Sequence, residues 1–292
     1  MELKIDKIDL FADWIEIISE ELSNQMFDIS GLNQDELSIL YFSNRKKIIQ
    51  PKKRTVHKSD TFSCPSEHLE GLEILEKKII DGELLRPNQS RMLKNLKDKD
   101  GLLFDWGIFH LHLGKDVESD GFIKRTGPLL YVLFDDNNAY FIDVLEHGQW
   151  TNQNLLKVIY KNWPQTIESY RIKGEGIIGL EKNCSDEEIN QLRRANVNVL
   201  IEIEPKVIFI GPGGGVAASG HSMEAIQNHM DNRRELQRLE NQIKDNTAEF
   251  LLRVFDNLDF IKNPHLKFKM IKNQFSHEIN EENNNFSIIL NR

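Results

Sequence analysis

The sequence predicts an α+β protein in which an antiparallel sheet is flanked by helices, with a second, smaller α/β lobe and a long helix. Two observations predict this class. Residues 102–147 contain apolar segments with the length and alternation of β-strands, and the segments on either side have the period of amphipathic helices. Further along, two strand-like segments and a glycine-rich loop at 211–220 precede a long polar segment with helical spacing.

The composition is that of a folded protein outside the membrane. The 292 residues suit one large domain or two modest ones. Hydrophobic residues make up 39% and charged residues 28%, and no apolar run approaches the roughly 20 residues of a membrane span. The first residues, MELKIDKIDLFADWIEII, lack the features of a signal peptide. Cys64 and Cys184 are far apart, so we expect a reducing cytoplasm and no disulfide framework.

The net charge of −9 argues against non-specific binding of nucleic acid over the whole surface, so a nucleic-acid site has to be a local basic patch. Residues 44–58 hold seven Lys or Arg and no acid. Pro51 interrupts them, which predicts two extended arms around a turn. This basic arm is either an electrostatic contact for phosphate or a solvated hairpin.

The first half of the chain contains most of the expected helices. Residues 7–24 place apolar side chains on one helical face, namely Ile8, Phe11, Ile15, Ile18 and Leu22. Asn33 or Ser30 caps a second, short helix that ends at Leu40. A third helix spans 66–80, and Pro87 opens a fourth that ends at Leu96.

After the strand block, Thr151 caps a helix that Pro164 ends, and Ser185 begins another. Two strands, 196–203 and 206–211, form a pair that turns at Glu204 and Pro205. The helix at 222–257 has an inward stripe of Ile226, Met230, Leu236, Leu239 and Ile243. We expect three segments: a helical segment with the basic arm (1–60), a sheet domain (61–170) and a lobe with the glycine loop and long helix (171–292).

The candidate chemistry lies on the sheet, where titratable side chains follow strand-forming sequence. Alternate residues of a strand share a face, so His110 and His112 point to the same side, with Phe109 and Leu111 on the other. His147 ends the third strand and approaches the two histidines in a suitable register. Lys124 and Arg125 precede the second strand.

One interpretation of the histidines is a metal site. His-x-His on a strand is a common pair of ligands, and Asp116, Glu118 or His147 could complete it. The spacing does not match known motifs, because no histidine follows Asp116 as it does in His-x-His-x-Asp-His. The preferred interpretation therefore has no metal and no cofactor.

A second interpretation is acid–base cleavage of RNA. His110, His112 and His147 supply imidazoles suited to proton transfer from a ribose hydroxyl, and Arg125 stabilises the charge on phosphate. Lys124 adds a further phosphate contact. The structural alternative is that the histidines hydrogen-bond the backbone, Trp106 or Trp150.

The glycine loop allows two interpretations as well. The backbone N–H groups of Gly213, Gly214 and Gly215 could bind phosphate at the start of the long helix. The loop lacks the Lys-Ser/Thr of a P-loop, so the alternative is a plain glycine turn capped by Ser222. The helix at 222–257 is either a solvated scaffold or a helix for a protein partner or a second copy of the chain.

A family resemblance adds to these patterns. The order of Arg125, LLYVLF, a turn and AYFIDVLEHG resembles the strand core of RelE/HigB/ParE-type toxins, with matches at 129–131 and 140–144. The resemblance covers about residues 66–164, and a wider phrase is similar to bacterial proteins of about this length. It implies a cytoplasmic endoribonuclease of toxin–antitoxin or phage-defence type that binds RNA, with Arg125 in the site. The alternatives are an interaction protein that binds a protein partner through the long helix, and a metal-dependent hydrolase.

Overall fold

A computed structural model describes residues 4–5, 7–174, 176, 178–245, 265–266, 268–272, 277–281 and 286–289. The fold is mixed α+β, with a sheet flanked by helices, as the sequence predicts. The chain divides into two compact units. Unit 1 contains residues 1–42 and 226–292, and unit 2 contains residues 43–225. The division into three segments at residues 60 and 170 stays a prediction.

Unit 2 is built on a four-stranded sheet with the order β2-β5-β4-β3. Its strands are β2 (Thr55–Lys58), β3 (Ile108–His112), β4 (Leu129–Phe134) and β5 (Asn138–Leu145). The pairs β3–β4 and β4–β5 are antiparallel, as expected, but β2 runs parallel to β5. The sheet is therefore mixed, because part of the basic arm adds an edge strand to it.

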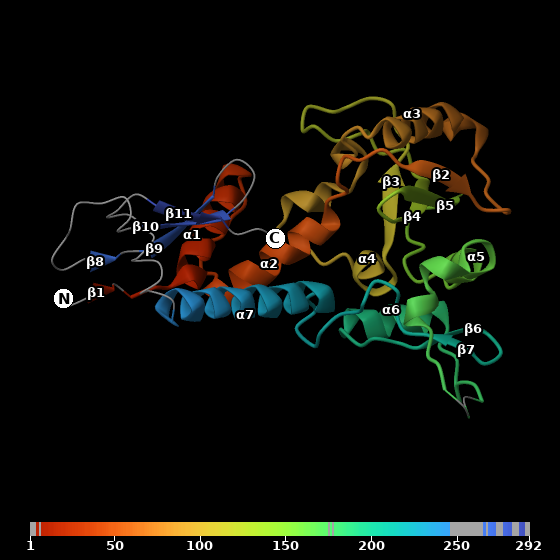
Figure 1. The fold of residues 1–292 in the computed structure, drawn as a ribbon. Coiled ribbons are helices and arrows are strands. Elements are labelled where there is room, and N and C mark those ends of the chain that lie inside the picture. Colours follow the sequence, from red (N-terminus) through yellow and green to blue (C-terminus); the bar gives the residue numbers. More distant parts are fainter. Residues whose placement is uncertain are drawn as a thin grey trace. The chain divides into compact units, whose positions relative to one another are not determined.

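Both faces of this sheet are covered, which Figure 1 shows with α3 (Leu69–Asp81) on one side and α5 (Asn154–Asn162) on the other. The α3 side is apolar, with Leu72, Leu75 and Ile79 packed on Leu111, Leu113, Leu130, Val132 and Phe141. The α5 side contains Ile108, Tyr131 and Ile142 against Leu155, Leu156 and Ile159. The alternation expected for β3 is confirmed, because Ile108 and Leu111 belong to opposite cores.

The segment before β3 differs from the expectation. Residues 101–106 form a short helix, α4 (Gly101–Trp106), instead of the start of the sheet. The Asp100 carboxylate caps this helix by accepting a hydrogen bond from the Leu103 N–H at 3.0 Å, and Gly107 ends it at a φ of +73°. The expected helix from Pro87 to Leu96 is two 3₁₀ turns, η2 (Arg86–Asn88) and η3 (Arg91–Lys94), because Ser90 starts a new turn between them.

The basic segment is not a pair of extended arms. The helix that Asn33 caps, α2 (Gln34–Lys47), continues past Leu40 and takes up the first basic cluster in its last turn. Cations are favourable there because the last carbonyls of a helix carry partial negative charge. Lys47 is only 2% exposed, and its ammonium group donates to the backbone oxygen of Asp98 at 2.9 Å.

The remaining helices of unit 2 are short. The 3₁₀ turn η1 (Ser66–His68) precedes α3, and η4 (Pro164–Thr166) and η5 (Glu168–Tyr170) follow α5. The N-cap residue of α5 is Gln153 and not the expected Thr151, and the Gln153 side chain makes no capping hydrogen bond. By contrast, Ser185 begins α6 (Asp186–Arg194) with a complete capping box that Glu188 closes. The expected strand pair is β6 (Ile201–Glu204) and β7 (Val207–Phe209).

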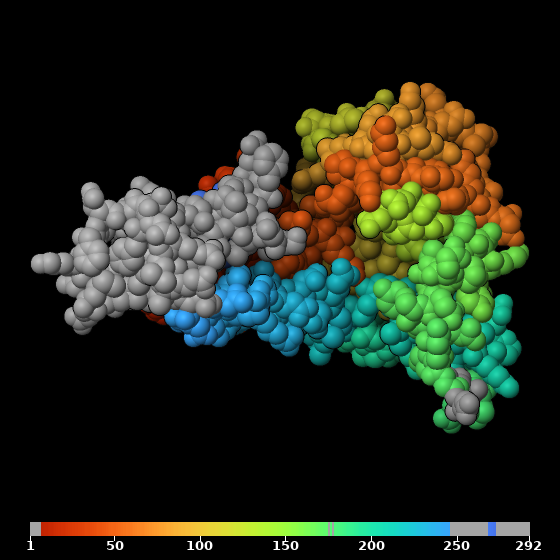
Figure 2. All heavy atoms as spheres, viewed as in Figure 1, coloured from red at the N-terminus to blue at the C-terminus, as the bar shows by residue number. Residues whose placement is uncertain are grey.

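The space-filling view shows the orange surface of β2 and α3 bordering the green surface of α5 (Figure 2). An ion pair between Asp60 and Lys161, 2.6 Å long, lies where the chain after β2 meets α5. The side-chain oxygen of Asn162 also accepts a hydrogen bond from the Asp60 backbone N–H at 3.0 Å. The end of β2 is therefore tied to the helix that covers the sheet.

Unit 1 combines α1 (Leu10–Asn24) with residues 34–42 of α2 and residues 226–245 of α7 (Met223–Asp245). Its strands are β1 (Lys4–Ile5), β8 (His265–Leu266), β9 (Phe268–Lys272), β10 (His277–Glu281) and β11 (Phe286–Ile289). Along α7 the expected stripe is buried at Leu236 and Ile243 and partly buried at Ile226 and Leu239, whereas Met230 is 40% exposed. His229 and Glu240 are buried as well. Residues 246–257 of the expected helix lie outside the described residues.

Within the described part of the chain, none of the helices combines the length and the apolar character that a membrane crossing requires.

Candidate functional site

A cavity of about 590 Å³ lies in unit 2 beside the histidine-bearing face of β3. His110, Arg125 and His147 line it, although they come from a strand, a loop and a turn. His147 does not end the third strand as expected, because β5 stops at Leu145 and the histidine lies in the turn that follows. These are three of the four side chains to which the sequence assigns catalysis. The structure therefore brings together groups that are up to 37 positions apart in the sequence.

Trp150 organises the imidazoles in this cavity. Its ring centroid lies 4.7 Å from that of His110 and 4.9 Å from that of His147. Tyr131, the cross-strand neighbour of His110, also packs on this indole at 6.0 Å. Two titratable rings thus share one rigid aromatic neighbour, by ring packing rather than by the hydrogen bond considered from the sequence.

His110 is held in the neutral form. Burial lowers its pKa from the ordinary value, and the nearby His147 lowers it further, against the opposing charges of Asp100 and Asp98. Its Nδ1 atom is buried without a hydrogen-bond partner among the described residues, at 3.9 Å from the Asp100 carboxylate. A neutral imidazole at the wall of a cavity can accept a proton from a bound molecule.

His112 does not line the cavity. It faces the same side of β3 as His110, but it is only 6% exposed. Burial lowers the pKa of His112 to about 4, with smaller contributions from His110 and Arg125. The catalytic role expected of His112 therefore stays a prediction, and the structure places this histidine outside the cavity.

Positive charge is in excess on the wall of the cavity. Four cations line it, against two carboxylates: Lys99, Arg125, Arg193 and Arg194, with Asp98 and Asp100. This local excess stands out in a chain whose net charge is −9. Such a wall favours an anionic ligand, and Arg125, which is exposed, is available to contact it.

Arg193 has a structural task within this wall. Its guanidinium donates to the buried Asp105 carboxylate at 2.7 and 3.1 Å and to the backbone oxygen of Trp150. It also lies 4.6 Å above the Trp106 ring. α6 is thereby fixed to α4 and to the indole between the histidines. No sequence pattern predicts this ion pair, because its partners are 88 residues apart.

The glycine loop does not offer its N–H groups to a ligand. Gly213 donates to the Asp105 backbone oxygen at 2.8 Å, Gly214 to that of Gly211 at 2.9 Å, and Gly215 to that of Phe104 at 2.9 Å. A side chain at Gly213 would collide with backbone atoms of α4, the nearest at 2.4 Å. The expected phosphate contact is therefore replaced by a close approach of two backbones.

The other two expectations for this region also change. Lys124 is exposed and does not line the cavity. Its backbone N–H donates to the Asp116 oxygen at 2.9 Å. The Ser222 hydroxyl is buried without a hydrogen-bond partner among the described residues, so it does not cap α7.

The proposed ligands of a metal are not gathered together. Glu118 pairs with Arg91 on η3. Nowhere in the described ranges do three His, Cys, Asp or Glu side chains meet in a way that could hold a metal ion.

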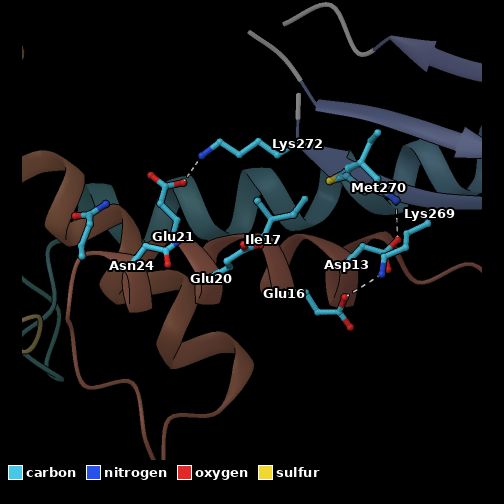
Figure 3. A pocket seen from close by; sticks show the side chains of 11 residues that line it. Asp13, Glu16, Ile17, Glu20, Glu21, Asn24, Lys269, Met270 and Lys272 are labelled. Carbon is cyan, nitrogen blue, oxygen red and sulfur yellow. Dashed lines mark hydrogen bonds and ion pairs between the residues drawn. The ribbon is translucent and has the colours of Figure 1, made fainter. Parts of the chain in front are cut away.

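A second cavity, of about 630 Å³, lies in unit 1 between α1 and β9 (Figure 3). Three of its acids have partners: Glu16 pairs with Lys269 at 3.2 Å, and Glu21 with Lys272 at 2.7 Å. The Asp13 carboxylate accepts the Met270 backbone N–H at 2.8 Å. These contacts attach β9 to α1, and we therefore place the candidate site in unit 2.

Comparison of the chain with protein-family models, curated proteins and solved structures gives no match. The resemblance to RelE/HigB/ParE-type toxins accordingly stays a prediction.

Proposed function

We propose that this protein is a metal-independent endoribonuclease of bacterial toxin or defence type, which cleaves RNA in the cavity beside β3. The observation that supports this proposal best is the placement of His110 and His147 against one indole, with Arg125 in the same wall. Two imidazoles and one guanidinium can supply the base, the acid and the charge stabilisation that phosphodiester cleavage needs when no metal takes part.

The two imidazoles have different roles in this proposal. Neutral His110 takes the proton of a ribose 2′-hydroxyl, and the 2′-oxygen attacks the adjacent phosphorus. His147 donates a proton to the departing 5′-oxygen, which leaves a 2′,3′-cyclic phosphate and a 5′-hydroxyl. Arg125 contacts the non-bridging oxygens, whose negative charge increases in the transition state. Burial of His110 supports its role as the base, and the exposed position of His147 suits contact with the leaving strand.

The exposed cations and Trp150 support RNA as the substrate. Lys99 and Arg194 extend the positive wall beyond Arg125 and could follow a phosphate backbone. The indole of Trp150, which is half-buried, presents an aromatic surface in the same cavity. Single-stranded RNA combines the anionic backbone and the flat bases that such a wall contacts.

The proposal is tested by incubating the purified protein with labelled single-stranded RNA in the presence of EDTA. We expect cleavage to a 2′,3′-cyclic phosphate. His110→Gln, His147→Gln and Arg125→Ala should each lower the rate by about 10² or more. Lys244→Ala, on an exposed turn of α7 in unit 1, is the control and should cleave at the normal rate.

Three outcomes would contradict the proposal. Full activity in the folded site variants would remove the site. Activity only after addition of a divalent metal would favour the metal-dependent hydrolase. Absence of cleavage together with a fixed protein partner would favour the interaction protein. The buried face of α7 is already occupied within unit 1: His229 contacts Ser38 at 2.8 Å, and Glu240 accepts the Leu10 N–H at 2.9 Å.

A further inference from the structure

Asp100 has two carboxylate oxygens with different surroundings. Oδ1 accepts the Leu103 backbone N–H at 3.0 Å and so caps α4. Oδ2 lies 3.9 Å from Nδ1 of His110. The cap fixes the orientation of the carboxylate, because rotation of the side chain would break the hydrogen bond to the first turn of the helix. The second oxygen is therefore held toward the imidazole by the fold.

His110 has a matching unpaired atom. Its Nδ1 is buried and has no hydrogen-bond partner among the described residues, while 15% of the side-chain surface stays exposed. The exposed part of the ring reaches the cavity, which leaves Nε2 as the nitrogen that can meet a substrate. A buried N–H or lone pair without a partner costs free energy, so a group that satisfies Nδ1 stabilises one orientation of the ring.

A water molecule beside the two groups, rather than in line between them, can contact both. A distance of 3.9 Å is too long for a direct hydrogen bond. A small cavity of about 20 Å³ is lined by both Asp100 and His110, together with Lys47, Asp98 and Ser90. This volume accommodates one water, and the polar walls supply the partners that a buried water needs.

Other charged groups around His110 raise or lower its pKa. Asp98 raises its pKa and His147 lowers it, and the ammonium of Lys47 is near the two aspartates. Lys47 donates to backbone oxygens at Asp98 and Asn95, so its hydrogen bonds go to the chain rather than to the imidazole. Among these groups, Asp100 is the carboxylate within ion-pair distance of the ring.

We propose that Asp100 is a positioning residue for His110: it accepts the Nδ1–H of the ring through one water, and leaves the Nε2 lone pair facing the cavity. The carboxylate also stabilises the imidazolium that forms when Nε2 takes a proton. The effect on catalysis rests on the proposed ribonuclease function, whereas the effect on the tautomer and the pKa of His110 does not.

The test uses Asp100→Asn in the full-length protein. Asparagine caps a helix as well as aspartate does, so the midpoint of thermal unfolding should stay within a few degrees of wild type while the charge is lost. We expect the pKa of His110, measured by NMR on ¹⁵N-labelled imidazoles without RNA, to fall. The fraction of the Nδ1–H tautomer should fall as well. His110→Gln identifies the signal among the nine histidines.

Two further variants sharpen the result. Asp100→Ser keeps a capping hydroxyl and should change the imidazole signals in the same direction. Asp98→Asn removes a carboxylate that contributes less to the His110 pKa and should have a smaller effect. With RNA, Asp100→Asn should lower the cleavage rate by about tenfold to a hundredfold, with an altered pH profile.

An unchanged or raised pKa of His110 in Asp100→Asn would overturn the positioning role, whatever the RNA assay shows. Changed imidazole signals in a protein that cleaves no RNA would support the positioning role and reject the ribonuclease. Changed signals with a normal cleavage rate would overturn the catalytic part of the inference.

Discussion

Two histidines that share one face of β3 have different environments: His110 reaches the cavity, and His112 is enclosed. The spacing of the sequence predicts the shared face, because strand side chains alternate. It does not predict exposure along the strand, which depends on chain segments that are distant in sequence. For the same reason the sequence does not predict Asp100 as a neighbour of His110. The one local sign was that Asp100 directly precedes an apolar helical segment, as an N-cap does.

The enclosed His112 predicts a specific dependence of stability on pH. Its pKa in the folded protein is about 4, below the value of about 6.5 in an unfolded chain. As the pH falls below the pKa of about 6.5, His112 becomes protonated in the unfolded chain but stays neutral in the folded protein. Stability therefore decreases from about pH 6.5 down to about pH 4, by an amount of up to about 3 kcal/mol from this residue.

The variant His112→Gln should lose this part of the acid sensitivity. The difference in unfolding free energy between neutral pH and about pH 4.5, measured in urea, should shrink by about 2 kcal/mol relative to wild type. His110 and the carboxylates keep their own contributions in both proteins. If both proteins lose stability equally on acidification, His112 is not held neutral by the fold.

At the scale of elements, local signals were reliable where the element is stabilised by its own residues. Ser185 and Glu188 form the capping box of α6, and the helical period at 7–24 gives α1. The errors are elements that depend on partners far along the chain. β2 is a strand because β5 provides a parallel edge, and a basic sequence on its own carries no sign of that pairing. The six residues of α4 are too few to show a helical period.

The ion pair between α4 and α6 should be important for the stability of unit 2. Asp105→Ala leaves the guanidinium of Arg193 largely buried without its carboxylate, a change that typically costs about 3–5 kcal/mol. We expect a lower midpoint of thermal unfolding and a weaker Trp150 contact, seen as a shift in tryptophan fluorescence. Lys182→Ala, which removes an exposed pair with Glu188 on the same helix, should change the midpoint little. Equal effects of the two substitutions would argue against a structural role for the buried pair.

At the scale of the whole molecule, composition predicted the class of structure and limited the kind of binding site. A chain with a net charge of −9 repels nucleic acid over most of its surface, so any RNA contact has to be local. The basic segment at 44–58 was the obvious sequence candidate, yet its first cluster ends a helix, and Lys58 pairs with Glu76 at 2.7 Å. The cations of the cavity come from separate segments, and their gathering is a property of the tertiary fold.

This local arrangement predicts a shallow dependence of RNA binding on salt, if the proposed function holds. Each phosphate neutralised on a single strand contributes a slope of about −0.7 to the logarithm of affinity against the logarithm of salt concentration. Lys99, Arg125 and Arg194 are the cavity cations outside the Arg193 ion pair, and together they give a slope of about −2. Affinity measured by fluorescence anisotropy should then fall about 20-fold from about 50 to about 200 mM salt.

Substitution separates the cavity from the rest of the surface. Arg125→Ala should make the slope shallower by about 0.7, because one phosphate contact is lost, whereas Lys244→Ala should leave it unchanged. A much steeper slope in the wild type, reduced by substituting Lys53 rather than Arg125, would place the RNA on the chain before β2. The cavity would then retain its histidines without a phosphate for them to act on, and the acid–base role of His110 would have to be abandoned.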